Sequence, residues 1–375
     1  MLSFEPSVKL EKALKKLQAE VLNTASGLDS LMAKEAHYLN HCALISNVGA
    51  STRIENALLT DAEVEWVDTT LTANGHTTAF EQRKEFILDK LSKDRERSVE
   101  EVVGCREVLV TIYSQARDFI PLTEMVIRGL HQDLLKFYPQ ASPYAGRYKT
   151  TPNRVISKNH ATGEVRTVLD PAAPGVATET AMSDLVAWFN ANRNESPWPL
   201  LVATEFVFRF LAIHPFQDGN GRIGRALFLL ALLQSDDAHL AAVMPYVALD
   251  RCIEQNRAQY YSVLHDVSQG LFQADPTRYR YEPLAWFFMK MTEVALRDVA
   301  HYRARYVRLQ QLSESASAVL QSFKSQPEQR LRVNDIVIAT QLPRRTVQYA
   351  LKTLTDQGFL LRLGQGAGVR YQLVF

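Results

Sequence analysis

One run of the chain, from His214 to Arg225, limits most strongly what the molecule can be. It brings together an imidazole, a carboxylate, glycines, an amide and two guanidinium groups. The apolar residues 226–233 follow directly and predict a buried helix whose N-terminal end faces the run. Gly219 and Gly221 let backbone N–H groups approach an anion closely. The run therefore predicts a phosphate site at a helix start, with a base beside it.

Length, charge and cysteines exclude several classes of protein. A chain of 375 residues can hold two or three domains, and 42 basic residues against 41 acidic ones give no overall charge that favours nucleic acid. Cys42, Cys105 and Cys252 lie far apart with no CxxC pair, which argues against zinc or disulfides. The N-terminus lacks the pattern of a signal peptide, and no uncharged run reaches about twenty residues. We therefore expect a cytoplasmic protein without a membrane segment.

Apolar periodicity predicts a mainly α fold. Residues 153–169 are the exception, because two β-prone runs flank a polar turn and predict a hairpin. The longer helices are expected at 8–35, 98–114, 122–137, 200–213 and 283–312.

The C-terminal residues 313–375 follow a different pattern. They predict helix, helix, turn, helix and two strands, the order of a small α+β winged helix-turn-helix domain. The third helix would present Arg344, Arg345 and Gln348 opposite the apolar Val347 and Leu351, as a DNA recognition helix does. Residues 311–375 hold eight basic and four acidic residues. Many such domains bind protein instead, so DNA and protein both stay open as partners.

The run at 214–225 matches the HPFxDGNGRxxR signature at every defining position, and the chain resembles the Fic (Fido) family. The resemblance implies a Fic-type helical core with a β-hairpin flap at 153–169. It also implies transfer of AMP from ATP to a Ser, Thr or Tyr hydroxyl of a protein, with release of pyrophosphate. One branch of the family has Lys in place of Gly221 and acts as a phosphotransferase, so Gly221 favours AMP transfer. On this basis we divide the chain into an N-terminal helical region 1–110, a catalytic core with trailing helices 111–312, and the winged helix 313–375.

Each signature residue has an expected task. His214 ionises near neutral pH and suits a general base. Asp218 is expected to hold Mg²⁺ on the phosphates of ATP, or to cap the following helix. Arg222 and Arg225 offer forked donors to the outer phosphates. The ATP-binding residues within the run are Asp218, Gly219, Asn220, Gly221, Arg222, Ile223, Gly224 and Arg225.

Two further features follow from the resemblance. Tyr260 and Tyr261 resemble the paired tyrosines of the adenine pocket, although aromatic residues there could equally form core; Ser268 would be the next contact. In relatives the flap aligns the target by strand addition, which here involves Val155 and Ile156. A hairpin can also be merely structural.

A second motif lies upstream, at Ser51, Glu55 and Asn56, and fits the inhibitory (S/T)xxxE(G/N) pattern of Fic proteins. The resemblance implies an inhibitory helix over 51–67 whose Glu55 pairs with Arg225 and blocks the γ-phosphate. Local structure offers another explanation, because Thr52 and Glu55 have the spacing of a capping box at the start of a helix over 54–67.

The leading function is therefore a self-inhibited protein adenylyltransferase. Removal of AMP from a modified protein is a second enzymatic function, and an ATP-sensing transcriptional regulator that binds DNA through 313–375 is a non-enzymatic one. The expected partners are ATP and a target protein, with the chain itself included among the targets. A homodimer stays open.

Overall fold

The structure, a computed structural model, describes residues 1–72, 78–91, 93–158, 165–194 and 198–375. Their contacts divide the chain into two compact units. The first unit comprises residues 1–57 and 100–299, and the second comprises 58–99 and 300–375. The division into residues 1–110, 111–312 and 313–375 that the sequence suggests remains a prediction. None of the described helices has the length and apolar character needed to cross a membrane.

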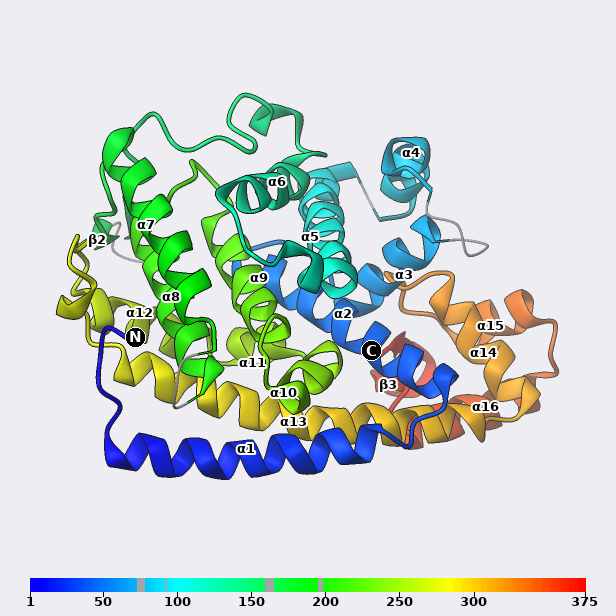
Figure 1. Cartoon of the computed structure of the whole chain (residues 1–375). Coiled ribbons are helices and arrows are strands. Elements are labelled where there is room, and N and C mark those ends of the chain that lie inside the picture. Colours follow the sequence, from blue (N-terminus) through cyan, green and yellow to red (C-terminus); the bar gives the residue numbers. More distant parts are fainter. Residues whose placement is uncertain (73–77, 92, 159–164, 195–197) are drawn as a thin grey trace. The chain divides into compact units, whose positions relative to one another are not determined.

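The first unit is helical and is built around α9 (Asn220–Leu233). Every residue from Ile223 to Leu233 is buried, because α9 packs against α8, α2, α6 and α10. Figure 1 shows α9 between α8 and α2. The helices that begin in this unit are α1 (Val8–Leu28), α2 (Ala33–Ile54), α6 (Glu124–Leu135), α7 (Val176–Asn192), α8 (Pro199–Ile213), α10 (Ala238–Val243), α11 (Leu249–Gln255), α12 (Arg257–Ser268) and α13 (Glu282–Gln310), together with most of α5 (Glu96–Gln115).

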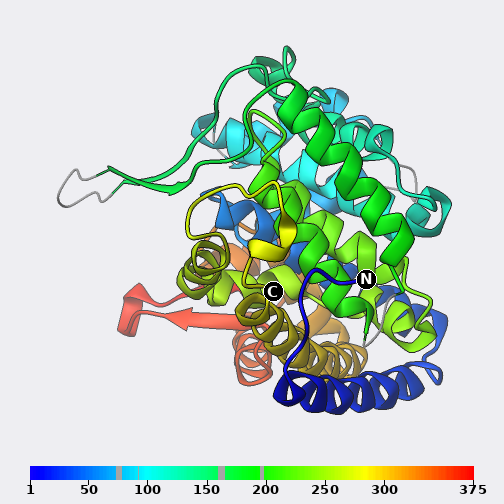
Figure 2. The same ribbon diagram turned by 60° about the vertical axis from the view of Figure 1, so that its left-hand side comes forward.

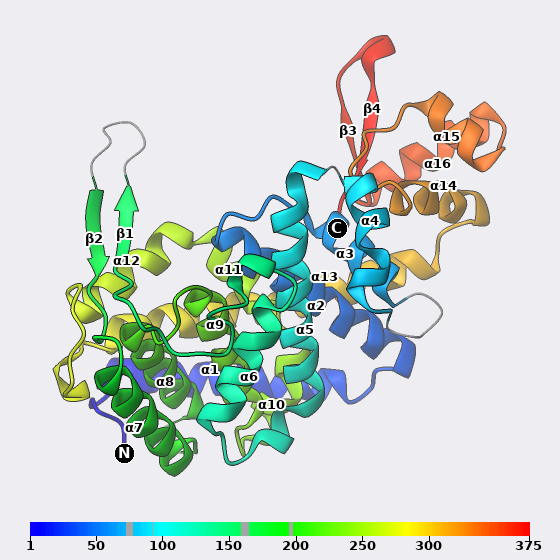
Figure 3. The same ribbon diagram turned by 90° about the horizontal axis from the view of Figure 1, so that it is seen from above.

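The predicted hairpin is present in the first unit. Strands β1 (Val155–Lys158) and β2 (Val165–Leu169) pair antiparallel, with a register shift after Val155. They run side by side away from the helices in Figures 2 and 3. The turn of the hairpin, residues 159–164, lies outside the described residues. Beyond β2, the backbone of Asp170 pairs with Gly270 and Phe272, which ties the hairpin base to the segment after α12.

The helix expected over 51–67 is wrong. Helix α2 ends at Ile54, because Asn56 adopts a left-handed backbone (φ 75°), and α3 (Asp61–Leu71) starts only after a connection. The capping box expected at Thr52 and Glu55 is also wrong, since the Thr52 hydroxyl donates to carbonyls of its own helix. The capping box lies at Thr60 and Glu63 instead. Likewise, the single helix expected over 8–35 is α1 followed by the start of α2.

The second unit contains α3, α4 (Phe80–Leu91), α14 (Glu314–Lys324), α15 (Val333–Thr340), α16 (Arg344–Asp356) and the antiparallel pair β3 (Leu360–Leu363) and β4 (Arg370–Leu373). Figure 3 shows the β3–β4 hairpin beside α14, α15 and α16. The apolar core of the second unit includes Phe323, Ile336, Leu351 and Phe359, and Ala62 of α3 packs into this core. Lys324 also pairs with Glu65 of α3 at 2.9 Å. Helix α3 is therefore part of this unit's core.

Candidate active site

The signature run joins two buried helices. It begins where α8 ends at His214, whose backbone is left-handed (φ 51°), and it continues through a loop into the first turns of α9. Gly219 precedes α9 with φ 80°, and a Cβ there would come within 2.9 Å of Leu134. This position therefore favours glycine chiefly for its backbone, because the Leu134 side chain could shift.

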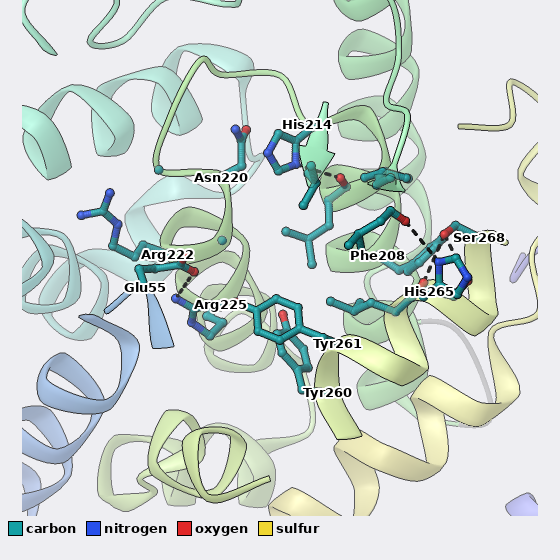
Figure 4. A pocket seen from close by; sticks show the side chains of 18 of the residues that line it. Glu55, Phe208, His214, Asn220, Arg222, Arg225, Tyr260, Tyr261, His265 and Ser268 are labelled. Atoms are coloured by element: carbon teal, nitrogen blue, oxygen red, sulfur yellow. Dashed lines mark hydrogen bonds and ion pairs between the residues drawn. The ribbon is translucent and has the colours of Figure 1, made fainter. Parts of the chain in front are cut away.

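The run opens into a pocket of about 230 Å³, shown in Figure 4. The pocket receives residues from the end of α2, the hairpin, α8, the loop, α9 and α12. Its lining consists of Glu55, Val155, Val168, Leu169, Phe208, Leu211, Ala212, His214, Gln217, Asp218, Gly219, Asn220, Gly221, Arg222, Arg225, Tyr260, Tyr261, Leu264, His265 and Ser268.

His214 is held in one tautomer. Its Nδ1 lies 3.2 Å from the carbonyl of Leu211, and because a carbonyl only accepts, Nδ1 carries the hydrogen. The neutral ring therefore keeps its lone pair on Nε2. The pKa of His214 is lowered to about 4, chiefly by burial and also by the charge of Lys149, although the hydrogen bond to Leu211 and the charges of Glu55 and Asp218 act to raise it. At pH 7 the imidazole is neutral and able to accept a proton.

The start of α9 lines one side of the pocket. The N–H groups in the first turn of a helix have no acceptor within it, and with the helix dipole they favour a negative charge. Asn220 braces this turn, since its side chain donates to the carbonyl of Phe216 (2.6 Å) and accepts from the N–H of Phe216 (2.9 Å). Asn220 therefore shapes the loop as well as lining the pocket.

Two residues predicted to bind ATP, Ile223 and Gly224, lie outside the pocket lining. Ile223 is fully buried in the core. A Cβ at Gly224 would come within 2.8 Å of the Leu211 side chain, so this glycine allows α9 to approach α8 closely. Neither residue is among those that line the pocket. Both positions lie on the inward face of α9, and their part in binding ATP remains a prediction.

The two arginines differ in their partners. Arg222 is buried; it lies 3.5 Å from Asp218 and 3.9 Å from Glu101. Among the described residues its Nε and Nη1 have no hydrogen-bond partner. Arg225 is also buried but well occupied: its Nε donates to the hydroxyl of Ser51 (3.0 Å) and its Nη2 to the carbonyl of Ser51 (2.9 Å).

Glu55 lies at the end of α2 and reaches the same arginine. Its Oε1 accepts from Nη2 of Arg225 at 3.0 Å, as Figure 4 shows. The carboxylate also covers Gly221, where an added Cβ would overlap it. Two contacts fasten this end of α2: Arg53 binds Glu254 of α11 through two bonds (2.7 and 2.9 Å), and Asn56 accepts from Arg257 of α12 (3.1 Å).

Both tyrosines of α12 line the pocket, and their contact with adenine remains a prediction. Tyr260 is buried and packs against Phe287, so it is part of the core as well. Tyr261 packs under the guanidinium of Arg257, with the guanidinium carbon 5.8 Å from the ring centre. Ser268 ends the same helix and lines the pocket too.

The hairpin contributes Val155 to the pocket, with Val168 and Leu169 from the opposite strand. Ile156 pairs with Thr167 through its backbone, and nothing is described of its side chain. His265 of α12 contacts the carbonyl of Val168 at 3.2 Å, which holds the hairpin against the helix.

Asp218 is suited to a hard cation. Its side chain is partly exposed at the pocket, where one carboxylate oxygen accepts from the N–H of Gly219 (2.6 Å). In the described part of the chain, no group of three or more His, Cys, Asp or Glu residues could hold a metal by itself. A Mg²⁺ ion here would need phosphate oxygens in addition to this carboxylate, which fits its usual manner of binding with nucleotides.

His131 has no recognisable signal in the sequence, and it is fully buried behind the loop. Its ring stacks on Phe216, with 3.7 Å between centres. Nδ1 accepts from the N–H of Gly146 (2.9 Å), so Nε2 carries the hydrogen and donates to the carbonyl of Asp218 (2.9 Å). Burial lowers the pKa of His131 to about 4. A neutral imidazole thus holds the Asp218 carbonyl away from the pocket.

Comparison with known proteins agrees with this geometry. Residues 121–232 match the model of the Fic/DOC family. This part of the chain is thus similar to the Fic/DOC family. The matched residues include His214, the loop and α9 up to Leu232, whereas Glu55 and α12 lie outside them.

The similarity to named Fic proteins is distant. The protein adenylyltransferase fic-1 of Caenorhabditis briggsae is 31% identical over 114 residues, which are 29% of this chain and 20% of that protein. Its Caenorhabditis elegans counterpart is 31% identical over 100 residues, 27% of this chain and 18% of that protein. The chain thus matches about a fifth of the length of these relatives.

Solved structures share the fold. A Fic family protein from Desulfovibrio desulfuricans G20 aligns with a TM-score of 0.57 and 21% identity, over 100% of this chain and 98% of that one. A Fic domain-containing signalling protein from Bacteroides thetaiotaomicron aligns with a TM-score of 0.52 and 23% identity, over 77% and 97%. The fold is a mainly α-helical Fic fold with a small C-terminal β-hairpin.

Proposed function

We propose that this protein is a self-inhibited protein adenylyltransferase, which transfers AMP from ATP to a Ser, Thr or Tyr hydroxyl of a target protein. One observation carries the proposal: a neutral imidazole and the N-terminus of α9 line one pocket, in which Glu55 holds Arg225. The distant similarity to adenylyltransferases supports the same chemistry.

In the proposed reaction, Nε2 of His214 takes the proton of the target hydroxyl. The hydroxyl oxygen then attacks the α-phosphorus, the bond from this phosphorus to the bridging oxygen breaks, and pyrophosphate leaves. The first-turn N–H groups of α9 stabilise charge on the phosphates, and Arg222 and Arg225 bind the outer phosphates. Mg²⁺ held by Asp218 would neutralise further phosphate charge. The phosphates of ATP therefore lie at α9 and its base at α12.

The remainder of the pocket suits the other parts of the two substrates. Tyr260 and Tyr261 supply aromatic surface for the adenine, with the apolar Leu264 beside them. The target segment would pair with β1 near Val155 and Ile156, since strand addition needs only backbone hydrogen bonds. Such docking leaves the identity of the target open, and it includes a second copy of this chain.

Self-inhibition is part of the proposal because Glu55 and a phosphate compete for the same donors of Arg225. The carboxylate also covers Gly221, at the start of α9. Ser51 and Asn56 would support it, the first by holding the guanidinium and the second by fastening the end of α2 to Arg257. A phosphate that displaces Glu55 must therefore break a charge-assisted hydrogen bond.

A second candidate function concerns residues 313–375, which we propose form a winged helix that binds DNA. Arg344, Arg345 and Gln348 are exposed along α16, while Val347 and Leu351 on its other face are buried. This arrangement is typical of a recognition helix. A protein that combines both functions would carry the catalytic pocket in one unit and the DNA contact in the other.

The test is transfer of label from α-labelled ATP to lysate proteins and to the chain itself. Glu55→Gly should label far more strongly than the natural protein, and adding His214→Ala should abolish the labelling. Absence of label from the Glu55→Gly protein, together with release of AMP from a modified target, would favour AMP removal instead. Mass spectrometry identifies the modified hydroxyl.

A further inference from the structure

A short segment before the hairpin, residues 149–153, holds the loop that carries His214. The ammonium of Lys149 donates to the carbonyl of Ile213 at 3.0 Å. Its backbone N–H donates to the carbonyl of Pro215 at 2.8 Å. Lys149 therefore binds the carbonyls of both residues that flank His214.

Asn153 completes this set of donors. Its side-chain amide donates to the carbonyl of His214 (3.1 Å) and to that of Phe216 (2.6 Å). Its oxygen accepts from the Lys149 ammonium at 2.9 Å. Consecutive carbonyls from residue 213 to residue 216 are thus all turned toward the 149–153 segment and bound there.

His214 needs this support because its backbone is left-handed (φ 51°), a conformation that residues other than glycine rarely adopt. Such a conformation persists only where the surroundings determine it. The N–H of His214 is fixed by Phe210 at 2.9 Å, and its carbonyl by Asn153. The orientation of the imidazole toward the pocket depends on these contacts.

Lys149 brings a charge as well as hydrogen bonds. Its side chain is buried with only 2% exposed, and the two acceptors of its ammonium are neutral oxygens. Burial lowers the pKa of Lys149 to about 8, so the ammonium is still mostly charged at pH 7. Three charged groups act on the imidazole of His214: Lys149 disfavours its protonation, and Glu55 and Asp218 favour it.

We propose that Lys149 is a positioning residue for the general base, which fixes the left-handed backbone of His214 and holds a positive charge next to its imidazole. The inference rests on the proposed role of His214. A neutral donor could satisfy the same carbonyls with a smaller cost of burial. The charge therefore has a consequence that hydrogen bonding alone does not have: it acts in the same direction as burial and lowers the pKa of the imidazole.

The experiment follows the imidazole directly, by NMR titration of ¹³C-labelled histidine in the full chain, with His214→Ala used for assignment. Lys149→Met removes the charge at similar length, Lys149→Arg keeps it, and Lys290→Met is a control at an exposed lysine of α13. We expect Lys149→Met to raise the His214 midpoint by about one pH unit, as loss of a neighbouring cation does. Lys149→Arg and Lys290→Met should leave it unchanged.

The same substitutions in the Glu55→Gly protein give the catalytic readout. Lys149→Met should lower kcat/KM at least about tenfold, with Lys149→Arg less affected. An unchanged His214 midpoint in folded Lys149→Met overturns the inference, and Lys149→Gln replaces that variant if it does not fold. If Glu55→Gly itself transfers no AMP, the proposed function fails, while the NMR midpoint still decides the effect of Lys149.

Discussion

Oε1 of Glu55 lies 3.0 Å from Nη2 of Arg225, although the two residues are far apart in the sequence. The guanidinium is buried, whereas the carboxylate is about one-third exposed. The exposed partner of such a pair can leave at a smaller cost than the buried one. Arg225 is therefore a fixed donor group, for which Glu55 and a phosphate can compete.

Replacing Glu55 by Gln should increase the affinity for ATP. The amide keeps the size of the side chain but loses the charge that pairs with Arg225, so ATP has a weaker competitor. We expect the Kd to fall about tenfold, which corresponds to about 1.4 kcal/mol. Calorimetry in a His214→Ala background measures binding without turnover.

Glu293→Gln, which removes a carboxylate paired with Arg297 on α13, serves as control. A Kd for ATP that is the same with Glu55→Gln as without it would contradict the competition.

Asp250 should become more important once Glu55 is gone. It is buried, 3.9 Å from Nε of Arg225, and its side chain is the other carboxylate that acts on this guanidinium. Asp250→Asn should therefore destabilise the Glu55→Gly protein more than the natural one. We expect the loss in free energy of unfolding to be larger by about 1–2 kcal/mol. Denaturant unfolding of all four proteins gives the coupling. Additive effects would show that the two carboxylates act independently.

The contiguous part of the site was the easiest to find from the sequence, although Ile223 and Gly224 do not line the pocket. Residues 214–225 carry their own pattern, and the apolar run after them could only be a buried helix. The region around Glu55 was harder, because Thr52 and Glu55 imitate a capping box and the left-handed Asn56 that ends α2 has no clear local signal. His131 and Lys149 were missed, since their importance arises only when packing brings them behind the loop.

His131→Phe tests how far the loop depends on the imidazole behind it. The aromatic ring can still stack on Phe216, but the partly buried Asp218 carbonyl and the buried Gly146 N–H each lose a partner. Each unsatisfied group costs about 1–3 kcal/mol, so the protein should unfold more easily. In the Glu55→Gly background we also expect kcat/KM to fall at least about tenfold. Retention of both stability and activity would show that stacking alone supports the loop.

The pH dependence of activity should show an unusually low acid limb. The lowered pKa of His214, about 4, means that the base is already deprotonated well below neutral pH. In the Glu55→Gly protein, kcat/KM should rise with pH to about 5 and be level from there to 7. An ordinary histidine would give only about one-tenth of the plateau at pH 5.5. The pH–rate profile of AMP transfer checks this, and a midpoint near 6.5 would contradict it.

Arg344 and Arg345 should determine binding of DNA if residues 313–375 act as a winged helix. Both are exposed at the start of α16, and replacing them by Ala removes two cations from the face that would approach the phosphates. We expect weaker binding of DNA, and the slope of the logarithm of the binding constant against the logarithm of salt concentration should be shallower by about two.

Lys352→Ala on the same helix is the matched control, because that lysine is already paired with Asp356 at 2.7 Å. Gel-shift titrations over a range of salt concentrations, with the full chain and a library of duplexes, measure both quantities. Equal binding by the double variant and the natural protein would place any DNA contact elsewhere, and no binding by either would leave residues 313–375 to a protein partner.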